Sequence, residues 1–71
     1  MLKYTIVIEK ANSNYSAYCP DLPGCVATGA TAEEATKRIK QAIEFHIEGL
    51  KAEGLEVPPP DTTSALVEVA A

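Results

Sequence analysis

Apolar and polar residues alternate along the first part of the chain with the period of two that is typical of β-strands. In residues 2–9, the alternating apolar positions are Leu2, Tyr4, Ile6 and Ile8. A polar turn over residues 10–14 follows, then a second alternating stretch at 15–19 and a third, shorter one at 25–28 that stops at Gly29. We therefore predict three strands, the first two joined as a hairpin.

The same alternation assigns the two faces of the predicted sheet. In the second strand it places Tyr15, Ala17 and Cys19 toward the core, and Ser16 and Tyr18 away from it. The outward face then carries an apolar row that nothing in the chain is expected to cover, consisting of Val7, Tyr18 and Val26.

From residue 32 the apolar period changes to three and four, which predicts one long helix over residues 32–53. Its apolar stripe consists of Ala35, Ile39, Ala42, Ile43, His46 and Leu50. Thr31 is the predicted N-cap, and Glu34 is predicted to complete a capping box by accepting a hydrogen bond from the Thr31 amide. Gly54 is the expected residue just past the helix C-terminus.

Residues 18–25, Tyr-Cys-Pro-Asp-Leu-Pro-Gly-Cys, predict a rigid connector between the second and third strands. Pro20 and Pro23 lack the amide hydrogen that a regular helix or ladder requires. Gly24 is able to take a positive φ. Asp21 is predicted to bond backbone amides two residues further on, in an Asx-type turn.

The C-terminal part predicts an extended linker and a last strand. Three consecutive prolines at 58–60 favour a stiff, extended backbone, and Ala65, Val67 and Val69 alternate with Leu66 and Glu68 in residues 64–71. The expected order is strand, strand, strand, helix, strand. This is an α+β fold in which one helix covers one face of a sheet.

A chain of 71 residues predicts a single domain, residues 1–71, with a small core. Such a chain buries only about 60% of its unfolded surface, and its sheet has an open edge. We therefore predict self-association, as a homodimer or a higher even oligomer. No signal peptide or membrane-spanning run is visible. We accordingly expect a cytoplasmic protein in which Cys19 and Cys25 are reduced, half-buried thiols.

The charge of the chain is unevenly distributed. Its net charge of −4 equals that of residues 44–61, whose acids and single base are Glu44, Glu48, Glu53, Glu56, Asp61 and Lys51. A solvated helix end explains this pattern, and so does an electrostatic complement for a basic partner. Glu44 and Glu48 repel each other at a spacing of four, which favours a partner. Clustered Lys and Arg, the mark of a nucleic-acid surface, are absent.

Residues for catalysis or metal binding are few. Asp21 is the only acid between Glu9 and Glu33, so the carboxylate cluster of a two-metal nuclease is missing. Two cysteines and one histidine do not readily make a zinc site, and no phosphate-binding loop is present. We interpret His46 as a packed core residue. We expect no enzyme activity, no metal and no cofactor.

The motif Tyr18-x-Pro20-Asp21-Leu22-Pro23-Gly24-Cys25, then Gly29-x-Thr31-x-x-Glu34-Ala35 and a helix ending Glu48-Gly49-Leu50, resembles the HicB-like antitoxin family. The resemblance covers about residues 4–60. It implies a degraded ribonuclease H-type sheet with one helix and no catalytic residues. Longer family members bind and block a small basic toxin, an RNA-cleaving enzyme of double-stranded-RNA-binding-domain fold. Those members often add a C-terminal DNA-binding domain, and because this sequence stops at Ala71 we expect no direct DNA binding.

The leading hypothesis is therefore an antitoxin module of a type II toxin–antitoxin system that masks a HicA-like toxin. The alternative is a stand-alone small oligomeric adaptor, and a residual nuclease is disfavoured by the missing carboxylates. The candidate partner-binding residues are Tyr18, Asp21, Leu22, Glu44, Glu48 and Glu53. The motif residues with a structural reason of their own are Pro20, Asp21, Pro23, Gly24, Gly29, Thr31 and Glu34.

Overall fold

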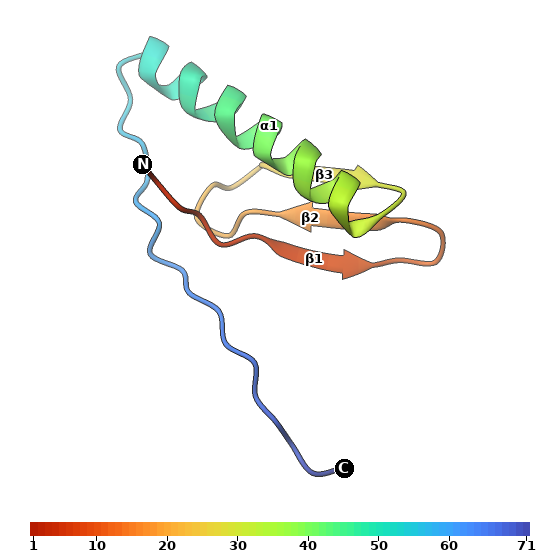
Figure 1. Ribbon diagram of the computed structural model, residues 1–71. Coiled ribbons are helices and arrows are strands. Elements are labelled where there is room, and N and C mark those ends of the chain that lie inside the picture. The colour runs from red at the N-terminus through yellow and green to blue at the C-terminus, as the bar shows by residue number, and fades with distance from the viewer.

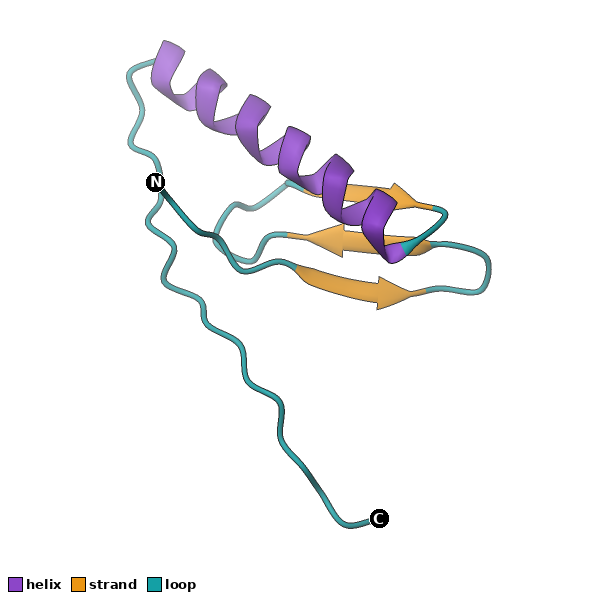
Figure 2. Ribbon diagram, viewed as in Figure 1, coloured by secondary structure: helices purple, strands orange, loops and turns teal.

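The computed structural model describes all 71 residues and contains three strands followed by one helix (Figure 1). The strands are β1 (Val7–Lys10), β2 (Tyr15–Tyr18) and β3 (Val26–Gly29), and the helix is α1 (Ala32–Ala52). The strands form one antiparallel sheet in the order β1-β2-β3. The helix crosses one face of this sheet (Figure 2), so the predicted α+β arrangement of three strands and a covering helix is confirmed.

The register of the sheet separates a buried row from an exposed one. Ala17 pairs with Ala27 on the face beneath α1 and is only 1% exposed. One residue further on, Tyr18 pairs with Val7 on one side and with Val26 on the other. Val26 is 67% exposed. The two faces are therefore those that the alternation predicted, and the outward apolar row is uncovered.

The first strand is shorter than predicted. It begins at Val7 instead of Leu2, because its partner β2 ends at Tyr18 and the connector then turns away. Pro20 also has no amide hydrogen to offer a neighbouring strand. The remaining boundaries, those of β2, β3 and α1, lie within one residue of the predicted ones.

Both ends of α1 are capped. The Thr31 hydroxyl accepts a hydrogen bond from the Glu34 amide at 3.1 Å, as predicted. The Glu34 carboxylate reaches back to the amide of Ala30, at 2.8 Å, and not to that of Thr31. At the other end Gly54 has φ +71°, and its amide bonds to Lys51, which is the Schellman arrangement.

Gly29 lets the third strand approach the start of the helix. A Cβ atom at this position would lie 2.6 Å from the Ala35 amide nitrogen and 2.9 Å from the Glu34 carbonyl carbon. Backbone atoms cannot yield easily at such distances. The glycine therefore brings β3 and the first turn of α1 together without a loop of several residues between them.

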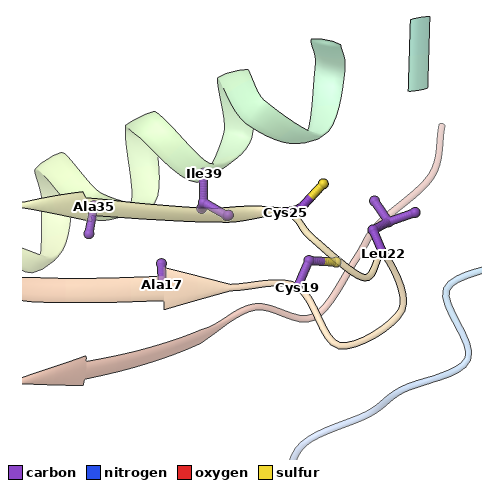
Figure 3. Packing of buried hydrophobic residues seen from close by; sticks show 6 residues of the cluster. All are labelled: Ala17, Cys19, Leu22, Cys25, Ala35 and Ile39. Atoms are coloured by element: carbon purple, nitrogen blue, oxygen red, sulfur yellow. The ribbon is translucent and has the colours of Figure 1, made fainter. Parts of the chain in front are cut away.

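The core is small and lies between the sheet, the connector and the first half of α1 (Figure 3). Its buried members are Ala17, Cys19, Leu22, Cys25, Ala35 and Ile39. Leu22 and Ile39 are the largest side chains that are fully buried. The N-terminal half of the predicted helix stripe is thus confirmed as the buried part, whereas its C-terminal half, including His46, is only half-buried.

The predicted fourth strand at residues 64–71 is wrong for the single chain. These residues are exposed, and no hydrogen bond involves residues 63–71. The segment runs away from the sheet as an extended chain (Figure 1). A strand needs a neighbour to satisfy its amides and carbonyls, and the path of the chain after Thr62 leads away from both sheet edges.

Candidate partner-binding surfaces

The connector between β2 and β3 is a tight, self-bonded turn. The Leu22 amide donates to the Cys19 carbonyl at 3.1 Å, and the Cys25 amide donates to the Leu22 carbonyl at 3.1 Å. Gly24 has the predicted positive φ, +89°. Pro20 and Pro23 are exposed on its outside. This geometry turns the chain so that the central side chain of the connector points into the core.

Leu22 was a candidate for partner binding, and the structure corrects this. Its side chain is 0% exposed and packs with the buried cysteines (Figure 3). In the sequence, the position of Leu22 between two prolines favours a surface residue. The turn instead directs it inward, where it fills the end of the core, so it presents no side-chain surface to a partner.

Asp21 holds the C-terminal segment and does not cap its own turn. Its two carboxylate oxygens accept hydrogen bonds from the amide and the hydroxyl of Thr62, at 3.0 and 2.8 Å. The Thr5 hydroxyl donates to the Thr62 carbonyl at 2.8 Å. The predicted Asx turn within the connector is therefore replaced by a contact across 41 residues of sequence. Together these bonds fix residue 62 beside the connector and the first strand.

Tyr4 makes a second attachment of the same segment by donating its hydroxyl hydrogen to the Pro58 carbonyl. Burial raises the pKa of the Tyr4 hydroxyl, and the neighbouring Cys19 and Asp21 raise it further. The hydroxyl therefore stays protonated and remains a donor. We call residues 58–62 the strap, which is bonded to the N-terminal segment at Tyr4 and to the connector at Asp21.

The two cysteines are unpaired and buried side by side at the ends of β2 and β3. They were predicted to be half-buried thiols, and they are more deeply buried than that. Burial raises the pKa of the Cys25 thiol, with a further contribution from Cys19. A raised pKa keeps the Cys25 thiol in its unreactive, protonated form. Both cysteines are buried members of the core and pack there as small apolar groups.

The second half of α1 exposes an aromatic ring and two acids. Phe45 is 78% exposed, and its neighbours Glu44 and Glu48 are exposed as well. The only ion pair in the structure joins Glu34 to Arg38, at 3.5 Å, in the first half of the helix. Glu44 and Glu48 thus have no cationic partner within the chain, and we call Glu44, Phe45 and Glu48 the acidic face.

A shallow groove of about 420 Å³ borders this acidic face. Phe45, His46, Leu50 and Glu53 line it from the helix side, and Cys25 lines it from the connector. Glu53 is the C-cap residue of α1 and is exposed. An incoming side chain would meet an aromatic ring, a half-buried imidazole and one carboxylate, which suits an apolar or cationic group.

Tyr18 marks a second surface, on the opposite side of the sheet. It is 40% exposed and lies between Val7 and Val26 in the outward row. The helix covers the other face, so Tyr18 and the acidic face cannot contact the same flat partner. The structure therefore divides the predicted partner-binding residues between two surfaces.

Sequence reasoning did not single out two residues with visible roles. Phe45 lies outside the predicted helix stripe, and a phenylalanine off the stripe and between two glutamates in sequence is the pattern of an exposed aromatic. Thr62 carried no signal, because its contact with Asp21 depends on the path of the whole strap. No group of three or more His, Cys, Asp or Glu side chains is arranged to hold a metal ion. The one helix lacks the apolar length needed to cross a membrane.

Comparison with known proteins decides the family. The model of the family described as "HicB_like antitoxin of bacterial toxin-antitoxin system" matches residues 4–70. The chain belongs to the HicB-like antitoxin family. The matched residues include the three strands, the connector, the helix and most of the C-terminal segment.

Relatives of this HicB-like chain occur in a phage and in a cyanobacterium. It is 47% identical over 55 residues to an uncharacterised protein of Haemophilus phage HP1, covering 78% of this chain and 41% of that protein. It is 48% identical over 59 residues to a UPF0150 protein of Synechocystis sp., covering 82% of this chain and 75% of that protein. The chain thus spans less than half of the phage relative.

A solved structure shares the fold. A chain of a "HicA3 and HicB3 toxin-antitoxin complex" superposes with a TM-score of 0.69 at 37% sequence identity. The match covers 83% of this chain and 70% of that one. At this identity the likeness extends beyond the fold to the family, in agreement with the family match.

Proposed function

We propose that this HicB-like chain is an antitoxin module that binds a small, basic, RNA-cleaving toxin and masks its RNA-binding surface. Family membership and the likeness to a chain of a toxin–antitoxin complex support an antitoxin role. The observation that carries the proposal is the acidic face, where an exposed aromatic ring lies on the same half of α1 as two exposed carboxylates that form no ion pair.

The acidic face has the chemistry to compete with RNA. A protein that binds RNA presents cations to phosphates, and Glu44 and Glu48 offer carboxylates to the same cations. Phe45 adds a large apolar contact, of the aromatic kind that carries much of the binding energy in protein interfaces. Charges at the rim act mainly on the association rate, whereas a buried aromatic acts on the dissociation rate.

The sharpest test measures binding kinetics with any small basic protein found in a reading frame next to that of this chain. Replacing Glu44 and Glu48 by Gln should slow association by up to about tenfold and flatten its dependence on salt, as expected for steering charges. Phe45→Ala should leave the association rate nearly unchanged and speed dissociation. Stopped-flow mixing at two ionic strengths separates these effects.

Glu9→Gln is the matched control, since Glu9 is exposed on β1, away from the second half of the helix. It removes one charge and should leave both rates close to those of the unaltered chain. Unchanged rates in the Glu44/Glu48 double variant would contradict the acidic face as docking surface, and Tyr18 on the other face would be tested next. No binding of any small basic protein would favour the stand-alone adaptor.

The chain itself is not expected to cleave RNA. The carboxylate of Asp21 is engaged by Thr62, and a metal-dependent nuclease needs several converging carboxylates. With Mg²⁺ or Mn²⁺ and a structured RNA, cleavage should fall to background on further purification. Activity that co-purified with the chain and vanished in Asp21→Asn would overturn this expectation.

A further inference from the structure

Two extended segments of the chain have backbone groups without partners. Residues 63–71 take part in no hydrogen bond, and residues 1–6 take part in no backbone–backbone hydrogen bond. In the C-terminal segment Leu66, Val67 and Val69 are strongly exposed, although β-branched residues such as the two valines favour sheets. An exposed, extended apolar segment beside an open sheet edge is the arrangement in which a strand adds to another sheet.

The open edge is that of β1 together with the residues that precede it. β1 pairs only with β2, so the backbone on its other side is free. In the residues before it, Tyr4 and Thr5 bond to Pro58 and Thr62 through their side chains alone, which leaves their backbone groups unpaired. Next to this edge lies an open, mainly apolar groove of about 570 Å³. Leu2, Tyr4 and Ile6 line it from the N-terminal segment, and Ile43 and Ile47 line it from the helix. Lys40, Glu44 and Lys51 add charged groups to its helix side. A strand added at this edge would place alternate side chains into that groove.

The C-terminal segment has the length and the pattern that the edge requires. Residues 64–71 and residues 2–9 are both eight residues long, or roughly 26 Å in strand conformation. Ala65, Val67 and Val69 share one side of the segment, which is free of charge, and Glu68 lies on the other. The uncharged side matches the apolar part of the groove, between Tyr4, Ile6 and Ile43, which favours that side of the segment facing inward.

The strand cannot come readily from the same molecule. Thr62 is held by Asp21 and Thr5, and the chain then runs away from its own sheet (Figure 1). Folding back would require a sharp reversal within residues 62–65, Thr-Thr-Ser-Ala, which contain no glycine or proline. A second copy offers a free segment and a free edge at once, and two-fold symmetry satisfies both.

We propose that two copies of this chain exchange their C-terminal segments, so that residues 64–71 of each pair with the β1 edge of the other. Val67 and Val69 then fill the groove between the N-terminal segment and α1. Sedimentation velocity at micromolar concentration should show the intact chain at twice its mass of 7.5 kDa. A chain shortened after Thr63 should sediment as a monomer, and so should Val67→Asp.

Glu68→Lys is the matched control, because it changes a charge in the same segment on the side away from the groove. It should remain a dimer. Far-ultraviolet circular dichroism of each variant verifies that α1 is retained, since the exchanged segment contributes nothing to the core. Isotope-filtered nuclear Overhauser spectra of a mixed labelled and unlabelled sample should connect Val67 with Ile6 or Ile43 of the other copy.

Several results would overturn the exchange. The exchange is wrong if the intact chain sediments as a monomer, if the shortened chain is still a dimer, or if the Val67 contacts arise within one molecule. Contacts of the segment that form only after a basic protein is added would assign it to that protein. The sedimentation and nuclear Overhauser measurements use this chain alone, so their outcome does not depend on the proposed antitoxin role. Only the last result involves an added protein.

Discussion

In the first half of α1, Ala35 and Ile39 are buried against the sheet, and Glu34 bonds to Ala30 and pairs with Arg38. In the second half Phe45 is exposed, and the acids have no ion-pair partner. The helix is continuous through both halves, yet only the first has fully buried side chains, while the second packs on the chain with half-buried ones such as Ile43. The first half therefore holds the fold, and the second is free to serve a partner.

The largest expected difference between the halves comes from truncating one large apolar side chain in each. Ile39→Ala should lower the free energy of unfolding by about 2–5 kcal/mol, because it opens a cavity in a small core. Phe45→Ala removes a larger side chain and should change stability by less than about 0.5 kcal/mol, because the ring is in water. Urea unfolding of both variants gives the comparison. Equal losses would mean that Phe45 is covered in solution.

Two glycines give a comparison in which the sign should differ. Gly29→Ala forces a Cβ against the backbone at the start of α1 and should cost about 1–3 kcal/mol. Gly49→Ala adds a Cβ that meets nothing within 4 Å, in a helical position where alanine is favoured by about 0.5–1 kcal/mol. Thermal unfolding should therefore show a lower midpoint for the first variant and a higher one for the second. A destabilised Gly49→Ala would show that this half of the helix is already in close contact with something.

The parts of the fold that were predictable from sequence are those controlled by neighbouring residues. The Thr31 cap, the positive φ of Gly24 and the Schellman ending at Gly54 depend on local chemistry, and the structure confirms each. The alternation of β2 also gave the correct faces, because one face is buried and the other is not.

The parts that were missed depend on contacts distant in sequence. Asp21 bonds to Thr62 because the strap returns to the connector. No pattern of neighbouring residues predicts that the chain returns there. The inward turn of Leu22 depends on two hydrogen bonds within the connector. Residues 64–71 do have the pattern of a strand, but a pattern does not supply the neighbour that a strand needs.

Removing the helix cap tests the first half in a milder way. Thr31→Ala leaves the Glu34 amide without its acceptor and should cost about 1 kcal/mol. Thr31→Asn keeps a side-chain oxygen at the cap and should retain most of the stability. Chemical denaturation of the two variants measures the difference. No loss in Thr31→Ala would imply that water replaces the hydroxyl without cost.

The smallest effect is expected from the acids of the second half, and its sign is informative. Glu44 and Glu48 repel each other at a spacing of four and lie toward the negative end of the helix dipole. Replacing both by Gln should therefore stabilise the free chain, by about 0.2–0.5 kcal/mol at low salt.

Glu34→Gln should have the opposite effect and destabilise the chain, because Glu34 lies at the positive end of the helix and pairs with Arg38. Denaturant midpoints at low and high salt test both, since screening should shrink each difference. A double variant that is less stable than the unaltered chain would mean that these acids already have partners within the protein, and a surface kept unpaired for a basic toxin would then be excluded.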